Sequence, residues 1–225
     1  MKTAEGEWLQ QVCFPLDILP TTNQSHRLLG YIDLLQQWNG TYNLTAVRDR
    51  AGMLTQHLAD CLAVVKPLSR HLQAAGVAGA RLLDVGSGGG LPGVVLAILL
   101  PQLMVTCVDT VGKKVAFVRQ VAGALALSNL ESVHDRVEGL QAHAFDVITS
   151  RAFASLAEFA RLTSAHLAPG AVWMAMKGKP PHDELEALPE SIDVFHVEHL
   201  KVSGLEADRC LVWMKPRSAD LGQRA

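Results

Sequence analysis

Two hydrophobic patterns divide this chain, and the change between them falls near residue 80. Apolar residues recur at spacings of three and four from residue 23 to about residue 38, which predicts a helix with one buried side. Asn39-Gly40 predicts its end. A second helix is expected from about residue 50 to 72, interrupted near Pro67, and the first twenty residues predict a short helix or a loose arm. Residues 1–79 are therefore expected to form an N-terminal helical cap.

From Arg81 onward, short apolar runs alternate with helical patterns. Strands are expected at 81–85, 104–109, 132–134, 145–149, 171–177, 192–199 and 209–215, and helices at about 92–100, 112–126 and 155–167. This alternation predicts a parallel sheet covered on both faces, and the last two strands, with no helix between them, predict an antiparallel hairpin at one edge. We expect a doubly wound α/β domain with a mostly parallel seven-stranded sheet over residues 80–217, followed by a tail at 218–225.

The stretch Arg81-Leu-Leu-Asp-Val-Gly-Ser-Gly-Gly-Gly-Leu-Pro-Gly93 reads as a buried strand, a tight turn and a helix start. Glycine allows positive φ and lets a ligand approach the backbone closely. Pro92 suits the first helical position, and the free N–H groups of a helix start attract anionic or polar ligands. The stretch therefore predicts a ligand-binding loop.

Two ligand classes fit these glycines. Gly88 to Gly93 matches the dinucleotide fingerprint G-x-G-x-x-G, whereas Asp84-x-Gly86-x-Gly88 is similar to the first motif of S-adenosylmethionine-dependent methyltransferases. A carboxylate at Asp84 would repel a pyrophosphate but not a ligand with ammonium and sulfonium charges, so it favours the methyltransferase. An Asp84 that only caps the turn is the alternative. Asp109 ends the next strand, where both classes of enzyme bind ribose hydroxyls, or it caps the following helix.

Composition narrows the class of protein. The 225 residues are 49% hydrophobic and 19% charged, as expected for a globular protein with a large core. The net charge of −2 excludes a global basic field, so any nucleic-acid surface has to be a local patch. No apolar run is long enough for a membrane span, the N-terminus lacks a signal-peptide pattern, and the four scattered cysteines fit reduced thiols. We expect a cytoplasmic protein without a structural metal.

Further polar residues follow the predicted strands, where such sheets bind ligands. Arg151 follows the fourth strand, beside the expected methyl group, as a functional group or as the partner of a nearby Asp. Residues 135–138 follow the third strand and either contact an adenine ring or form an exposed turn. Lys177 and Lys179 follow the fifth strand and either meet RNA or are solvated. His57 lies within an apolar helical pattern and is expected to be a structural histidine with satisfied hydrogen bonds.

Several motifs together resemble one family over roughly residues 28 to 215. They are Trp38-Asn39-x-x-Tyr42-Asn43-Leu44-Thr45-x-x-Arg48-Asp49, His57-x-x-Asp60, Asp84 to Gly93, Asp109-x-x-x-Lys113-Lys114-x-x-Phe117, Arg136-Val-Glu138, Ser150-Arg-Ala152 and Met176-Lys-Gly178. The family is the bacterial small-subunit ribosomal RNA guanine-N7 methyltransferases, or glucose-inhibited division protein B family. Cys61 and Thr110 depart from it, where Ser is common in both positions.

The resemblance implies transfer of a methyl group from S-adenosylmethionine to N7 of a guanine in 16S rRNA. It places Gly86, Leu91, Val137, Glu138 and Arg151 at the cofactor, and the residue patterns above add Asp84, Gly88 and Asp109. Guanine N7 carries no proton, so no general base is needed, and Arg151 is expected to position the guanine. The basic residues expected to meet RNA are Arg27, Arg48, Arg50, Lys113, Lys114, Lys177 and Lys179. We expect a monomer that acts on rRNA within a ribosomal particle.

Three alternatives stay open on the sequence. The glycine fingerprint also fits an NAD-linked oxidoreductase, although no residue stands out as an acid for hydride transfer. A methyltransferase could act on another substrate. A non-catalytic binding module could retain the sheet and use the helical cap to recruit a partner.

Overall fold

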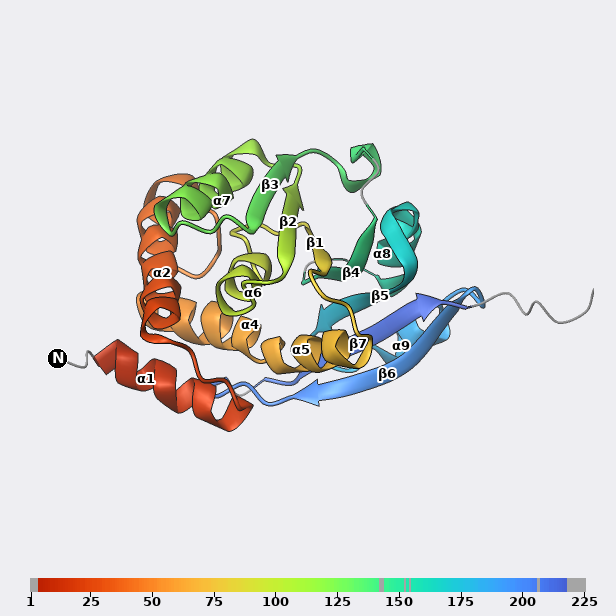
Figure 1. The fold of residues 1–225 in the computed structure, drawn as a ribbon, viewed down its shortest axis with the longest axis horizontal. Helices are drawn as coiled ribbons and strands as arrows, with labels where there is room; N and C mark the ends of the chain where they lie inside the picture. The colour runs from red at the N-terminus through yellow and green to blue at the C-terminus, as the bar shows by residue number, and fades with distance from the viewer. Residues whose placement is uncertain (1–3, 142–143, 152, 154, 206, 218–225) are drawn as a thin grey trace, which may run out of the picture.

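The computed structural model describes residues 4–141, 144–151, 153, 155–205 and 207–217, and its centre is a seven-stranded sheet (Figure 1). The order of strands across the sheet is β3-β2-β1-β4-β5-β7-β6. The strands are β1 Arg81–Val85, β2 Met104–Asp109, β3 Leu130–His134, β4 Phe145–Ser150, β5 Leu167–Lys177, β6 Ile192–Leu200 and β7 Arg209–Pro216. The predicted doubly wound α/β class is confirmed.

Pairing within the sheet changes direction at one side. β1 to β5 pair in parallel, with Leu82 opposite Val105 and Leu83 opposite Ile148. β7 runs antiparallel to both β5 and β6, so the last two strands form the predicted hairpin with β6 at the edge. The carboxyl ends of β1, β2 and β4 consequently meet at one edge of the sheet, where the glycine loop emerges.

Helices cover both faces of the sheet, because successive side chains of the buried strands point to opposite sides. Leu82 packs into the core on one face and Leu83 into a separate core on the other. The first face is covered by α2 Thr22–Tyr42, α4 Asp60–Leu62, α5 Val65–Ala74, α6 Gly93–Leu99 and α7 Gly112–Ala124. The second is covered by α8 Leu156–Thr163 and α9 His182–Glu186.

The N-terminal segment is helical, as predicted, but α2 ends later than Asn39-Gly40 suggests. α1 spans Ala4–Cys13, and α2 starts after a capping box between Thr21 and Gln24. The backbone reaches the left-handed region only at Asn43, with φ of 51°, so Asn43 and not Gly40 ends the helix. Asn39 stays helical, and its buried side chain bonds to the connector that follows.

The second predicted helix is divided at a different place from the one expected. α3 Arg50–Gly52 leads into a π-helical turn, Met53–Ala59, and then α4. The break lies at residues 63–64, and Pro67 falls in the first turn of α5, where its missing N–H has no helical partner to lose. Pro92, expected at the first helical position, is the residue immediately before α6. β5 begins at Leu167, four residues before the predicted position of 171, because α8 ends early in a 3-10 turn.

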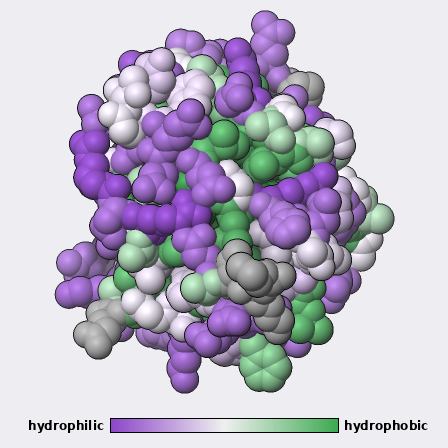
Figure 2. Space-filling model, turned by 90° about the vertical axis from the view of Figure 1, so that its left-hand side faces the viewer, coloured by the Kyte–Doolittle hydropathy of each residue, from purple (hydrophilic) through white to green (hydrophobic). Residues whose placement is uncertain are grey.

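One side of the molecule is mostly polar. Figure 2 shows the side that lies on the left in Figure 1: hydrophilic side chains cover most of it, with smaller hydrophobic areas between them. None of the helices in the described ranges combines the length and the apolar character that a membrane span requires.

Candidate functional site

The glycine loop has the backbone conformation that its sequence predicts. Gly86, Gly88 and Gly90 have φ of 66°, 57° and 83°, in the region that disfavours other residues. The N–H groups of Gly86 and Ser87 both donate to the carbonyl of Val108, which holds the loop between the ends of β1 and β2. A Cβ on Gly90 would lie 2.5 Å from Val94 Cγ2, so this position has no room for a side chain.

Asp84 is completely buried beneath the start of α6, because alternation along β1 places it on the same face as Leu82. Its Oδ2 accepts a hydrogen bond from the Gly93 N–H at 2.8 Å, so the carboxylate does cap the turn. Its Oδ1 has no partner among the described residues. Burial raises the pKa of Asp84 to about 7, against the lowering effect of the Gly93 hydrogen bond and of the positive charge on Arg151. No part of Asp84 is open to a ligand in this conformation, and its role at the cofactor stays a prediction.

Asp109 connects the glycine loop to the loop that follows β2. Its Oδ2 accepts from the Gly88 N–H and its Oδ1 from the Val111 N–H, both at 2.9 Å. Lys114 Nζ lies 3.7 Å from the same carboxylate. Asp109 therefore holds together the loop that follows β1 and the loop that follows β2.

A cavity of about 370 Å³ opens beside these residues, and we call it the glycine-loop cavity. Of the residues predicted to bind the cofactor, Gly86, Asp109, Val137 and Glu138 line it. Asp84, Gly88, Leu91 and Arg151 lie outside its lining. The other lining residues are Val85, Val108, Thr110, Val111, Lys114, Asp135, Arg136, Phe153 and Leu162. Apolar side chains with a carboxylate at the strand end suit an adenosine, whose flat base packs on apolar groups and whose ribose donates hydrogen bonds.

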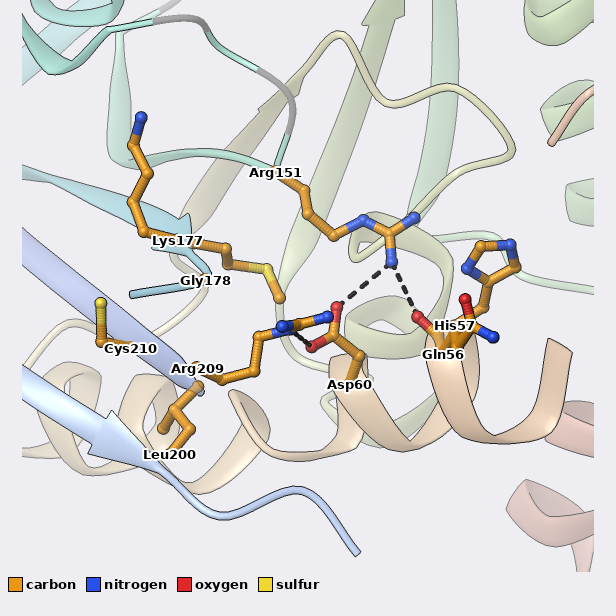
Figure 3. Close-up of a pocket in the computed structure, with 10 residues that line it drawn as sticks. Gln56, His57, Asp60, Arg151, Lys177, Gly178, Leu200, Arg209 and Cys210 are labelled. Atoms are coloured by element: carbon orange, nitrogen blue, oxygen red, sulfur yellow. Dashed lines mark hydrogen bonds and ion pairs between the residues drawn. The ribbon is translucent and has the colours of Figure 1, made fainter. Parts of the chain in front are cut away.

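A second cavity of about 330 Å³ lies on the other side of the end of β4, and we call it the arginine cavity (Figure 3). Arg151 Nη1 lies 3.3 Å from Oδ2 of Asp60, the first residue of α4. Arg209 Nε, at the start of β7, donates to Oδ1 of the same carboxylate at 2.7 Å. Arg151 is thus the partner of a nearby Asp, one of the two alternatives from the sequence, and it also lines a cavity. Its functional role stays a prediction. The further lining residues are Gln56, His57, Met176, Lys177, Gly178, Leu200 and Cys210.

His57 is only partly the satisfied structural histidine that the sequence predicts. Its Nε2 lies 2.7 Å from Thr45 Oγ1, but its buried Nδ1 has no partner among the described residues. Burial, with help from the charge of Arg151, lowers the pKa of His57 to about 4. The ring is therefore neutral at pH 7 and cannot act as a cationic group there.

The basic residues expected to meet RNA lie in different surroundings. Arg48, Lys113 and Lys179 are exposed. Lys177 Nζ bonds to Glu184 at 2.8 Å and points away from Asp60 in Figure 3. Lys114 faces Asp109, and Arg50 pairs with Glu5 and Asp33. Arg27 lies away from the carboxyl ends of the strands. Its guanidinium donates to the Ala126 carbonyl, on the loop that leads into the amino end of β3.

The sequence patterns did not identify Arg209, and they included Asp60 only as part of a family motif. The two residues are 149 positions apart and meet only because β7 inserts beside β5. Nothing local in the sequence marks that pair. Within the described part of the chain, no group of three or more His, Cys, Asp or Glu side chains could hold a metal ion.

Comparison with known proteins assigns the chain to a family. Residues 24–212 match the model of the family described as rRNA small subunit methyltransferase G. A Methylibium petroleiphilum protein of that name is 56% identical over 94% of both chains, and one from Acidovorax sp. is 58% identical over 86% of this chain and 87% of its own.

Solved structures agree on the fold. TrmN from Thermus thermophilus has a TM-score of 0.52 and 21% identity over 68% of this chain and 48% of its own. A SAM-dependent methyltransferase from Aquifex aeolicus has a TM-score of 0.51 and 19% identity over 68% of this chain and 91% of its own. With the glycine loop, the two cavities and this match over most of its length, the chain belongs to the rRNA small subunit methyltransferase G family.

Proposed function

We propose that this protein transfers the methyl group of S-adenosylmethionine to N7 of a guanine in small-subunit ribosomal RNA. The observation that carries the proposal is the match of residues 24–212 to the family model. The site geometry supports it, because a cavity suited to adenosine and a cavity lined by arginines both lie at the carboxyl ends of parallel strands.

The glycine-loop cavity is the place for the cofactor. Asp109 would accept hydrogen bonds from the ribose hydroxyls, and Val137 and Glu138 would lie near the adenine. Asp84, buried behind the glycine loop, would stabilise the cationic methionine portion through its charge when it is ionised. Gly86, Gly88 and Leu91 would shape the loop around it. When bound, S-adenosylmethionine supplies an electrophilic methyl group.

The side chains around the arginine cavity suit a reaction that needs no proton acceptor. Guanine N7 presents a lone pair and no proton, so it can attack the methyl group directly. His57 is neutral and held by Thr45, which fits a structural role. Arg151 would orient the base, and catalysis would rest on in-line positioning and electrostatics.

The substrate form and cellular setting follow from the same proposal. A chain of net charge −2 has no global attraction for naked RNA, so a ribosomal particle with a fixed shape is the better substrate. We infer that the enzyme acts as a monomer in the cytoplasm, where that particle is assembled. Family membership argues against the NAD-linked and non-catalytic alternatives.

The test is methyl transfer from labelled S-adenosylmethionine to small subunits from a strain that lacks the endogenous enzyme. Strand scission after reduction and aniline treatment maps N7-methylguanine, and we expect one strong site. Protein-free rRNA measures the contribution of the particle. Cofactor binding without transfer to any RNA would refute the substrate assignment, and failure to bind S-adenosylmethionine would refute the enzyme assignment.

A further inference from the structure

Asp60 is a buried carboxylate with unused hydrogen-bonding capacity at the wall of the arginine cavity. It is 3% exposed, and each of its oxygens has one arginine partner among the described residues. Each oxygen of an ionised carboxylate can accept two hydrogen bonds. One position on each oxygen therefore stays available for a ligand that enters the cavity.

Other hydrogen-bonding side chains lie beside the Asp60 carboxylate. The side chains of Arg151 and Arg209 are 27% and 26% exposed, so each guanidinium is partly accessible beside Asp60. The π-helical turn places Gln56 and His57 on the same cavity, and the Nδ1 of His57 is buried without a partner among the described residues. The cavity is thus lined by polar and charged side chains that can pair with a polar ligand.

The position of the arginine cavity relates it to the methyl group. β1 and β4 pair side by side, with Asp84 opposite Thr149, and Ser150 Oγ donates to the Val85 carbonyl at 2.8 Å. Val85 lines the glycine-loop cavity, and Arg151, directly after Ser150, lines the arginine cavity. The linings of the two cavities thus reach the neighbouring ends of β1 and β4, which would bring a base in one near a cofactor in the other.

We propose that the arginine cavity receives the target base and that Asp60 selects guanine by accepting hydrogen bonds from its N1–H and its 2-amino group. This inference rests on the proposed function. Guanine carries an acceptor, O6, beside the N1–H donor, which matches Arg151 beside Asp60. Adenine carries a donor and an acceptor in the reverse order and would set N1 against the carboxylate. A site built to pair with specific polar groups strongly rejects a ligand that lacks them.

A backbone phosphate is the competing occupant, and Asp60 argues against it. Two arginines alone would suit a phosphate. The carboxylate between them neutralises part of their charge and would itself repel an anion at short range. The mixed set of donors and acceptors fits the edge of a base better.

The experiment replaces the mapped guanosine by inosine in rRNA that is then assembled into the particle. Inosine keeps N7, O6 and N1–H and lacks only the 2-amino group. For the unmodified enzyme we expect kcat/KM to fall at least about tenfold on inosine. For Asp60→Asn, which replaces one acceptor by a donor, we expect guanosine and inosine to be methylated within about threefold of each other.

Two controls separate base selection from structural damage. Glu198→Gln removes the carboxylate of another arginine pair, with Arg70 at 2.8 Å on the edge strand, and should keep the full preference for guanosine. Binding of S-adenosylmethionine by Asp60→Asn shows whether that variant is folded.

The outcomes distinguish the two proposals. Equal rates on guanosine and inosine with the unmodified enzyme would overturn the proposed role of the 2-amino group and leave the proposed function intact. An Asp60→Asn enzyme that loses activity on both bases by the same factor would reduce Asp60 to a structural residue. No methylation of a guanine N7 by the unmodified enzyme would overturn the function and this inference together.

Discussion

At the scale of single residues, two buried groups titrate abnormally, and their effects on stability oppose each other. Burial raises the pKa of Asp84 to about 7, so the folded protein binds a proton there that the unfolded chain has lost above pH 4. This contribution to the free energy of unfolding is present below pH 4 and is lost as pH rises towards 7. Burial lowers the pKa of His57 to about 4, so its contribution is present above pH 6.5 and is lost as pH falls towards 4.

Substituting either residue should expose the effect of the other. Each group contributes at most about 1.4 kcal/mol per pH unit. Asp84→Asn should make the slope of stability against pH between 4.5 and 6.5 more positive, and His57→Gln should make it more negative. Urea unfolding at several pH values, in protein without cofactor, measures both slopes. Parallel curves for the three proteins would show that neither pKa is shifted as described.

The sequence located the residues of the proposed cofactor site better than those of the arginine cavity. Asp84, Gly86 and Asp109 lie at the ends of adjacent parallel strands, and local pattern alone locates such ends. Asp60 and Arg209 meet through the pairing of β5 with β7, which no local pattern encodes. The sequence also could not predict that Nδ1 of His57 lacks a partner among the described residues, because apolar neighbours predict burial but not which hydrogen bonds form.

At the scale of elements, the junction of β1, the glycine loop and α6 tolerates almost no added volume. A Cβ on Gly93 would lie 2.6 Å from Cys107 Sγ and 2.9 Å from Asp84 Oδ2, both buried. Gly93→Ala should therefore lower the free energy of unfolding by roughly 1–3 kcal/mol through overpacking and should weaken cofactor binding.

Gly123 is the matched control for this substitution. It lies in α7, and a Cβ there meets nothing within 4 Å. Gly123→Ala should stabilise the protein by about 0.4–1 kcal/mol. Chemical denaturation of both variants measures the difference, and a Gly93→Ala protein as stable as Gly123→Ala would contradict the packing argument.

The connector at residues 43–49 depends on one buried side chain. Asn39 is 1% exposed, donates to the Val47 carbonyl at 2.8 Å and accepts from the Thr45 N–H at 2.9 Å. Asn39→Ala leaves both backbone groups without a partner and should cost about 2–4 kcal/mol of stability. It should also loosen Thr45, which contacts His57, and so slow methyl transfer to RNA more than it weakens cofactor binding.

Gln37→Ala, on the exposed side of α2, is the control and should change stability by less than about 0.5 kcal/mol. Calorimetry titrates the cofactor, and the labelled transfer assay gives the rate. If Asn39→Ala weakened cofactor binding as much as it slowed transfer, the connector would support the glycine loop rather than the arginine cavity.

The predicted elements agree with the structure where periodicity dominates and differ where side chains override it. β1 and β2 have the predicted bounds, since buried parallel strands are continuous apolar runs. α2 outlasts its Asn-Gly signal because the side chain of Asn39 bonds forward along the chain, to Thr45 and Val47. The π-helical turn at Met53–Ala59 has no sequence signature that helix periodicity could reveal.

At the scale of the whole molecule, the order of secondary elements determined the architecture. Alternating strands and helices leave few topologies that bury both faces of a parallel sheet, and right-handed crossovers narrow them further. The family prediction, made from motifs spread over most of the chain, is confirmed by the match to residues 24–212. The division into a cap and a catalytic domain stays a prediction, although α2, α5 and β1 contribute residues to one hydrophobic core.

Charge is the property of the whole molecule that should govern RNA binding. With a net charge of −2, affinity has to come from local basic residues, of which Arg48, Lys113 and Lys179 are exposed. Arg48→Gln and Lys179→Gln should each weaken binding to the small subunit. Each should also reduce the slope of log affinity against log salt by about 1 for every phosphate that no longer has a cationic partner.

Lys66→Gln is the control, because Lys66 pairs with Asp17 near the N-terminal helix, and it should leave the slope unchanged. Filter binding from low to moderate salt gives the slopes. An equal decrease of slope in all three variants would mean that RNA senses total charge, and an unchanged slope in all three would place the phosphate contacts elsewhere on the molecule.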